Sequence, residues 1–306
     1  MGGEMNHSFE MWLRNEGKTD GTIKEYLTAL NKLTGWYEKV EKESFDPIRV
    51  TTLHLHDFKK YLDEELRLSP STVNKTINGL RSFFSFSVEA GNLQYDPSRK
   101  LKLKRSQTNQ LKPKWLTKQE TAKYYHEIYK ANNEWFRARD LALSRLMSSA
   151  GLRIQEVADL QMSDIVLEKR REIVNVRGGK GGKARILPCN GDLVGDLKEW
   201  LRLRETRLIK PSAEKCLFIS ERGTKLAVRS IFHVVQSYGE AARIHGMHPH
   251  RLRHSYGRRL IESGNDLIQV AYLMGHESIE TTKIYILPGE REHRMAVNSI
   301  SEIRME

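Results

Sequence analysis

The chain is short of cysteine, of long apolar runs and of acidic residues. Among its 306 residues are two cysteines, Cys189 and Cys216. They match neither a metal-binding spacing nor a disulfide framework, so we expect a protein of the reducing cytoplasm. No run of about eighteen apolar residues occurs, and the N-terminus carries no apolar signal core. The sequence therefore indicates neither a membrane-spanning segment nor export.

Acidic residues are too few to balance the basic ones. The chain holds 51 Lys and Arg against 39 Asp and Glu, a formal net charge of +12 at pH 7. This excess favours a polyanionic partner, nucleic acid before a membrane surface. Charge alone leaves open the alternative of a soluble basic protein without such a partner. The length leaves room for two domains, each large enough to bury its own core.

Residues from about 8 to 91 carry a helical pattern throughout. Apolar residues share one helix face along residues 9–13 and recur at spacings of three and four along residues 23–37, 55–62 and 73–84. Ser69-Pro70 is typical of a helix start, and Gly91 of a helix end. We therefore predict a compact bundle of four helices as a first domain over residues 1–98.

The apolar periodicity disappears between residues 99 and 116, and no acidic residue interrupts this stretch. We predict a linker here, with residues 117–306 as the second domain. Two interpretations remain open, a solvated hinge or a strap across a phosphate backbone, in which each basic residue adds salt-sensitive, sequence-independent affinity. The candidate contacts are Lys100, Lys102, Lys104, Arg105, Lys112 and Lys114.

The second domain reads as helical except for residues 165–187, which are rich in Ile and Val and predict a small antiparallel sheet. A glycine-rich hairpin, RGGKGGK, joins its last two strands, with Lys180 at the tip and Lys183 beyond. A nucleotide-binding P-loop is excluded because Arg177 and Ala184 occupy the positions that require Gly and Ser or Thr. A turn with solvated lysines remains the alternative to a functional loop.

The stretch from residue 248 to 287 gathers reactive side chains on short elements. Three short helices are predicted here: Pro249, Asp266 and Ser278 mark their starts, and Gly264 and Gly275 mark the ends of the first two. His250 and Arg253 are three residues apart, so they share one helix face. His276 follows Gly275, and Tyr285 comes nine residues later. A phenol, two imidazoles and a guanidinium are the groups that an attack on a phosphodiester needs.

A histidine cluster in this region is a weak metal candidate. Zinc sites usually combine histidine with acidic or thiolate ligands, whereas the neighbours here are arginines that repel a cation. The cluster consists of His245, His248, His250 and His254, and its basic neighbours are Arg251, Arg253, Arg258 and Arg259. We predict no metal and no other cofactor.

Taken together, these motifs resemble the tyrosine recombinases, the phage-integrase and Xer-type family. Arg153 in GLRIQEV, Lys180 in its hairpin, His250-x-x-Arg253, Gly275-His276 and Tyr285 follow the family's order and approximate spacing. The resemblance covers nearly the whole chain. It implies a mainly α fold with a small antiparallel β-sheet, in which a helical, SAM-like core-binding domain precedes a mixed α/β catalytic domain.

The resemblance also implies roles for these residues. Arg153, Arg253 and His276 would stabilise the phosphate, and Tyr285 would attack it to give a 3′-phosphotyrosyl intermediate. His250 would accept the phenol proton, and Lys180 would protonate the departing 5′-oxygen. Glu156 would orient Arg153. Tyr256 and Tyr272 are nearby alternatives to the nucleophile, but one lies in the arginine-bearing helix and the other precedes His276.

The expected function is site-specific DNA recombination without ATP or metal, as in integrases, resolvases and transposases of mobile elements. The partner would be double-stranded DNA with paired inverted sites, bound by a homotetramer that assembles from monomers or weak dimers. The C-terminal tail could dock on a neighbouring subunit or on its own domain. The rival functions are a type IB topoisomerase, a non-catalytic DNA-binding regulator, and a metal-dependent nuclease, for which the sequence offers no carboxylate cluster.

Overall fold

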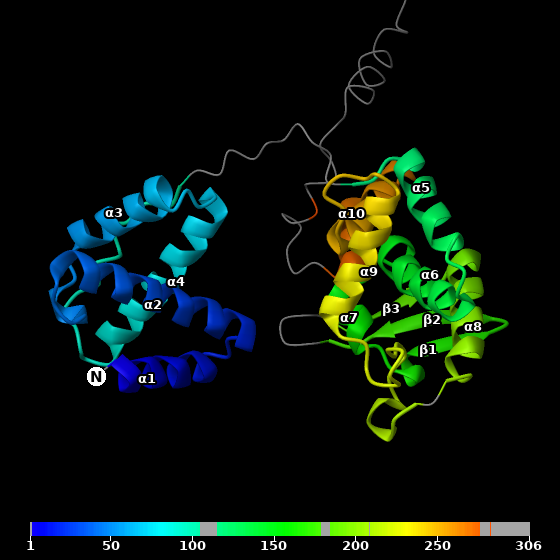
Figure 1. The fold of residues 1–306 in the computed structure, drawn as a ribbon, viewed down its shortest axis with the longest axis horizontal. Coiled ribbons are helices and arrows are strands. Elements are labelled where there is room, and N and C mark those ends of the chain that lie inside the picture. The colour runs from blue at the N-terminus through cyan, green and yellow to red at the C-terminus, as the bar shows by residue number, and fades with distance from the viewer. Residues whose placement is uncertain (1, 105–114, 179–183, 208, 276–281, 283–306) are drawn as a thin grey trace, which may run out of the picture. The chain divides into compact units, whose positions relative to one another are not determined.

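The chain folds into two compact units, which span residues 1–110 and 111–306 (Figure 1). This computed structural model describes residues 2–104, 115–178, 184–207, 209–275 and 282. The fold is mainly helical with one small antiparallel sheet, as the sequence predicts. In the described ranges, no helix combines the length and the apolar character that crossing a membrane requires.

Four α-helices build the first unit, as its apolar stripes predict. They are α1 (Gly2–Asn15), α2 (Asp20–Glu41), α3 (Thr52–Lys60), which continues into a π-helical turn (Tyr61–Glu65), and α4 (Pro70–Glu89), with a 3-10 turn at Pro47–Arg49. Thr19, Thr51 and Ser69 start α2, α3 and α4 by accepting a hydrogen bond from a backbone N–H of the first turn. These caps satisfy donors that a helix start otherwise leaves without partners.

The core of the first unit is apolar and rich in aromatic rings. The ring of Phe9 packs edge-on against Phe83 with centroids 5.3 Å apart, and Trp36 lies 5.4 Å from Phe58. Among the described residues of this unit, the buried polar ones carry no charge; they are Thr76, Ser87 and Ser98. Hydrophobic burial and ring packing therefore account for this fold.

The first residues of the predicted linker pack on this unit. Leu101 is fully buried in its core. The amide of Asn74 pairs with the backbone of Lys104 at 2.8 and 2.9 Å, and the Lys104 ammonium forms an ion pair with Asp63. The domain boundary predicted after residue 98 therefore lies inside a segment that is packed as far as residue 104.

The second unit combines helices with a three-stranded sheet. Within the described residues the helices are α5 (Lys118–Tyr129), α6 (Glu134–Ser149), α7 (Ile154–Asp159), α8 (Gly191–Arg204), α9 (Val228–Ala241), α10 (Pro249–Glu262) and α11 (Leu267–Met274), with 3-10 turns at Met162–Asp164 and Pro211–Ala213. The strands are β1 (Ile165–Glu168), β2 (Arg171–Val176) and β3 (Arg185–Pro188). Helix α6 runs through the core and packs against α8 and α10.

The sheet is antiparallel in the order β1-β2-β3. Ile165 lies opposite Val174, and Val176 lies opposite Arg185. Because side chains alternate along a strand, Arg185 and Leu187 of β3 point inward and are buried, whereas Ile186 between them is 53% exposed. This register places a charged side chain inside the second unit.

Helices α10 and α11 begin and end where the sequence predicts. Pro249 occupies the first position of α10, and Gly264 just after its end has a φ of +83°. Asp266 caps α11 by accepting the N–H of Gln269, and Gly275 ends it in the left-handed conformation. The third helix predicted in this stretch lies outside the described residues.

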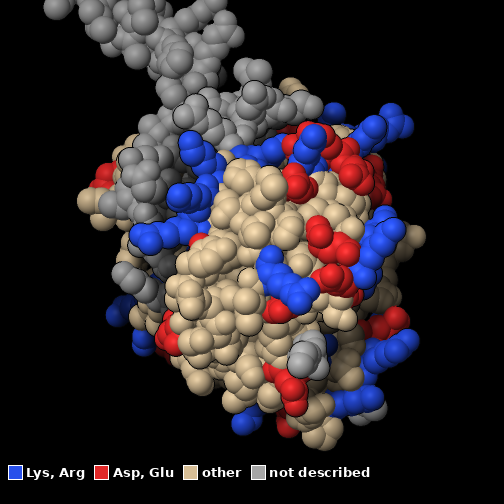
Figure 2. All heavy atoms as spheres, turned by 90° about the vertical axis from the view of Figure 1, so that its left-hand side faces the viewer, with Lys and Arg blue, Asp and Glu red and all other residues tan. Residues whose placement is uncertain are grey.

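Charges on the surface are mixed. On the face shown in Figure 2, basic and acidic side chains are interspersed around a broad area of uncharged residues, with basic side chains gathered toward the upper left edge. The positive excess of the chain therefore does not cover this face uniformly.

Candidate active site

The site begins at the turn into α7. Arg153 is the N-cap of this helix, and Glu156 in its first turn accepts the Arg153 backbone N–H at 2.7 Å. The same carboxylate accepts a hydrogen bond from Nη1 of the Arg153 side chain at 3.0 Å. One carboxylate thus holds both the backbone and the guanidinium of Arg153, whose side chain stays 35% exposed.

Arg253 reaches the same place from α10. Its guanidinium is buried and donates to the carbonyl oxygens of Gly151 and Met274. Gly151 has a φ of +70°, and a Cβ atom there would lie 2.4 Å from the Tyr256 ring. Glycine is therefore required at the turn that presents this carbonyl to Arg253.

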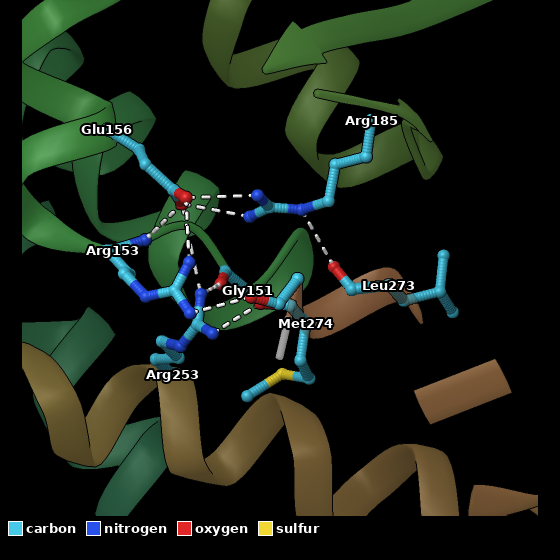
Figure 3. Close-up of polar contacts among 8 residues, drawn as sticks. Gly151, Arg153, Glu156, Arg185, Arg253, Leu273 and Met274 are labelled. Atoms are coloured by element: carbon cyan, nitrogen blue, oxygen red, sulfur yellow. Dashed lines mark hydrogen bonds and ion pairs between the residues drawn. The ribbon is translucent and has the colours of Figure 1, made fainter. Parts of the chain in front are cut away.

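The last carbonyl groups of α11 each accept a hydrogen bond from a different arginine. The acceptors Leu273 O, Met274 O and Gly275 O are paired in that order with Arg185, Arg253 and Arg153 (Figure 3). The final carbonyls of a helix lack partners within it and form the negative end of its dipole. The end of α11 thus binds three guanidinium groups that come from three other elements.

Glu156 lies at the centre of this arginine cluster. Nη1 and Nη2 of Arg185 donate to its two oxygens at 2.9 and 2.8 Å, and Arg253 Nη1 lies 3.8 Å from Oε2. Burial alone would raise the pKa of the Glu156 carboxyl, but hydrogen bonds and attraction from Arg185 and Arg153 lower it to about 2. Glu156 is therefore ionised at any pH at which the protein works.

Arg185 was not predicted from the sequence. It lies on β3, its side chain is 2% exposed, and a Cβ atom on Gly275 would come within 2.6 Å of its Nη1. The sequence does carry a signal for it. An alternating strand pattern that places Leu187 inward also places Arg185 inward, and a buried arginine requires a partner such as a carboxylate.

His250 lies one helical step before Arg253, at the exposed start of α10. Partial desolvation of its ring lowers its pKa, and the positive charges of Arg253 and Arg153 lower it further. The imidazole is therefore neutral at pH 7 and able to accept a proton.

The two alternative tyrosines differ in their surroundings. The Tyr256 ring packs against α11, and burial raises the pKa of its phenol despite the nearby Arg185, Arg259 and Arg253. Tyr272 lies on α11 and is 61% exposed. Burial makes the phenol of Tyr256 harder to ionise than that of a free tyrosine, which disfavours it as a nucleophile.

Comparison with known proteins assigns the chain to a protein family. A sequence model described as the phage integrase family matches residues 114–290, and one described as the phage integrase N-terminal SAM-like domain matches residues 7–90. The chain belongs to the phage integrase family of tyrosine recombinases. Its fold and its two-part layout are those of this family.

Individual relatives cover most of this recombinase. It is 28% identical to the TnP I resolvase of Bacillus thuringiensis over 92% of this chain and 94% of that protein. It is 30% identical to the tyrosine recombinase XerC of Pseudomonas savastanoi pv. phaseolicola over 90% of this chain and 88% of that protein. The crystal structure of the XerH site-specific recombinase bound to a palindromic difH substrate superposes with a TM-score of 0.76, at 25% identity, over 92% of this chain and 80% of that one.

The structure brings some of the predicted site residues of the recombinase together. Arg153, Glu156 and Arg253 meet at the end of α11, and His250 lies beside them on α10. Lys100 and Lys102 are exposed on the first unit, while Lys104 is paired with Asp63. The other predicted residues lie outside the described residues; they are Arg105, Lys112, Lys114, Lys180, Lys183, His276 and Tyr285.

Proposed function

We propose that this recombinase cleaves and rejoins DNA at a phosphate held by Arg153 and Arg253, with Tyr285 as the nucleophile. The bond from the phenol oxygen to phosphorus forms as the bond from phosphorus to the 5′-oxygen breaks. The product is a 3′-phosphotyrosyl link and a free 5′-hydroxyl, which can attack in reverse without ATP because the link conserves the energy of the broken bond.

One observation carries this proposal. Arg153 and Arg253 come from distant parts of the chain, yet they donate to adjacent carbonyls, those of Gly275 and Met274. The next residue along the chain is His276, and Tyr285 follows nine positions later. A pair of planar guanidinium groups at this point suits the equatorial oxygens of a five-coordinate phosphorus.

Electrostatics supports a role in charge stabilisation. Preorganised donors directed at developing charge are typically worth roughly 3–4 kcal/mol each. Two arginines and His276 would then supply about 10 kcal/mol of the barrier, and proton transfer must supply more. The cluster holds three arginines against Glu156 alone, so it keeps an excess of positive charge for a phosphate.

His250 and Lys180 are the proposed proton carriers. A phenol with an ordinary pKa of about 10 needs a base to lose its proton at neutral pH. His250 suits this role because its lowered pKa keeps it neutral. The cleavage rate should therefore fall as the pH drops through the lowered pKa of His250, where the base becomes protonated. Lys180 would give a proton to the departing 5′-oxygen from its glycine-rich hairpin.

The proposed partner is double-stranded DNA with paired inverted sites. Four subunits would act together, assembled from monomers or weak dimers on synapsed DNA. The palindromic substrate of the similar XerH structure supports inverted sites. Sequence-independent contacts would come from the exposed Lys100 and Lys102 and from Arg105, Lys112, Lys114 and Lys183. The few cysteines and a DNA substrate support action in the cytoplasm, and no metal takes part in the proposed chemistry.

A nicked suicide duplex tests the proposal. A binding site is first selected from random-sequence duplexes with the wild-type protein and then nicked near each candidate cleavage position, so that the released fragment diffuses away. A covalent protein–DNA adduct is expected with wild type and none with Tyr285→Phe. Tyr272→Phe is the matched control and should form the adduct normally.

The same assay separates the rival functions. A non-catalytic regulator would bind the selected duplex and form no adduct. A type IB topoisomerase would form the adduct and relax supercoiled DNA, but would give no recombinant from DNA with two sites. An adduct that persists in Tyr285→Phe would exclude Tyr285 as the nucleophile.

A further inference from the structure

Arg185 is the buried arginine of the cluster that has no role in the proposed chemistry. Its two terminal nitrogens contact both oxygens of Glu156, and its Nε donates to Leu273 O at 3.1 Å (Figure 3). Within the described residues, these side-chain hydrogen bonds go to Glu156, which holds Arg153, and to the end of α11. Both of its terminal nitrogens bind a carboxylate, whereas those of Arg253 bind neutral carbonyls, so the charge of Arg185 is matched by Glu156 and is not directed at a phosphate.

The charge of Glu156 poses a problem that Arg185 solves. The Glu156 carboxylate orients Arg153 by accepting hydrogen bonds from the side chain and the backbone N–H of Arg153. A carboxylate next to Arg153 also cancels part of the Arg153 charge and repels the phosphate that Arg153 must bind. These effects are strong at a site that is partly buried and therefore poorly screened.

Arg185 is rigidly placed to offset that charge. The paired N–H groups of a guanidinium match the two oxygens of a carboxylate, which fixes the angle as well as the distance between them. The close approach of Gly275 to Nη1 limits movement on the α11 side of the guanidinium. The Glu156 carboxylate is thus shared between two arginines, one nearly buried and one 35% exposed.

We propose that Arg185 is a positioning residue that neutralises Glu156, so that Glu156 can orient Arg153 without weakening its attraction for the phosphate. This inference rests on the proposed function, in which Arg153 binds the scissile phosphate. It differs from a purely structural role because it predicts that the need for Arg185 disappears when the Glu156 charge is removed.

A double-mutant cycle on cleavage tests the inference. The rate of adduct formation is measured under single-turnover conditions on the nicked selected duplex, well below the unfolding temperature of each variant. Arg185→Met should slow cleavage about 10- to 100-fold in the wild-type background. This is the loss typical when a residue that orients an active-site group through one intervening contact is removed, as known from metal sites. In the Glu156→Gln background the same change should slow cleavage less than about threefold.

Two results would overturn the inference. Equal losses in the two backgrounds would mean that Arg185 supports only the fold, and would overturn the inference while leaving the proposed function intact. A wild-type protein that forms no adduct would overturn the proposed function and the inference with it. Arg204→Met is the control for loss of a buried arginine, because Arg204 binds the carbonyls of Ala213, Glu214 and Cys216 instead of Glu156.

Arg185→Lys keeps the test informative if Arg185→Met does not fold. Lysine retains the charge and loses the paired geometry. Because the inference assigns the effect to charge, a folded Arg185→Lys should cleave within about fivefold of wild type. A larger loss in the folded protein would overturn the inference.

Discussion

The two units bury different kinds of side chain. In the first unit, the described buried polar residues are uncharged, and aromatic rings fill the core. The second unit buries charged residues in number; the described ones are Arg139, Asp140, Asp164, Arg185, Arg204, Arg253 and Arg258. Burying a charge costs free energy unless it is paired, and a buried pair adds little stability over an apolar replacement. The comparison teaches that apolar packing holds the first unit together, whereas the second unit combines an apolar core with charges held in fixed positions.

A pair of leucines on α3 tests the first half of this comparison. Leu55 is fully buried and Leu53 is 67% exposed, two positions apart on one helix. Leu55→Ala should lower the free energy of unfolding of the first unit by about 2.7–5 kcal/mol, because it removes buried methyl groups and leaves a cavity. Leu53→Ala should change it by less than about 0.5 kcal/mol. Urea unfolding measures both, and equal effects would mean that this core is not what stabilises the unit.

Arg253→Lys tests the second half. Lysine keeps the charge but lacks the fork of N–H donors with which Arg253 binds Gly151 O and Met274 O and would also reach the proposed phosphate. Cleavage of the nicked duplex should slow about 10²–10³-fold, which corresponds to about 2.7–4 kcal/mol of transition-state stabilisation.

A buried arginine outside the site gives the matched comparison. Arg204→Lys should lower the unfolding temperature and leave the cleavage rate per folded molecule unchanged, because the hydrogen bonds of Arg204 to described residues go to the loop carbonyls named above. If both lysine variants lost activity equally, the buried charges of the second unit would share a structural role, and the distinction between the units would fail.

The pH dependence of stability sharpens the comparison further. The pKa of Glu156 is about 2 in the folded protein and about 4.3 in the unfolded chain. Its ion pairs therefore stabilise the fold fully above about pH 5, and this contribution is lost as the pH falls from there toward 2. The contribution is roughly 2–3 kcal/mol, since one pKa unit is equivalent to 1.36 kcal/mol.

The double variant Arg185→Met/Glu156→Gln lacks this titrating pair. Between about pH 6 and pH 3 the free energy of unfolding of this variant should fall by roughly 1–2 kcal/mol less than that of wild type. In wild type, Glu156 of the unfolded chain takes up a proton over this interval while folded Glu156 stays ionised. Denaturant unfolding of the second unit at each pH measures the difference. Identical pH profiles would show that Glu156 is not held by its arginines as described.

The smallest expected effect concerns the start of the second unit. Thr117 caps α5 and forms a capping box with Glu120. Thr117→Ala should cost about 1 kcal/mol of stability in this unit and leave cleavage unchanged. Thr121→Ala is the control, because among the described residues its hydroxyl bonds back to the Thr117 carbonyl within the helix, and it should cost less than about 0.5 kcal/mol. A Thr117 variant as stable as its control would show that the cap is not needed.

The parts predicted from the sequence are those encoded locally. Pro249, Asp266 and Gly275 specify the ends of α10 and α11 because each residue type suits one backbone position. The apolar stripes of the first unit predict its four helices because a spacing of three and four residues places side chains on one helix face. The convergence of Arg153 and Arg253 was expected only through the family resemblance, since no local pattern links positions so far apart.

The parts not predicted are those that depend on contacts between distant segments. Arg185 pairs with Glu156 across 29 positions and with Leu273 across 88. The docking of residues 99–104 on the first unit depends on partners at Asn74 and Asp63, which no pattern within the linker reveals. Composition identified that stretch as basic and polar, which is typical of a linker, but the single buried Leu101 joins it to the core.

The pairing of three arginines with successive carbonyls has a consequence for control of the enzyme. The guanidiniums of Arg153, Arg253 and Arg185 each donate to one carbonyl of the same short length of backbone, and His276 follows it directly in the sequence. A displacement of that backbone would remove one hydrogen-bond acceptor from each of the three guanidiniums at once, leaving Arg153 and Arg185 held by Glu156 and Arg253 held by Gly151 O. The end of one eight-residue helix is thus a single point at which all three guanidiniums can be disturbed together.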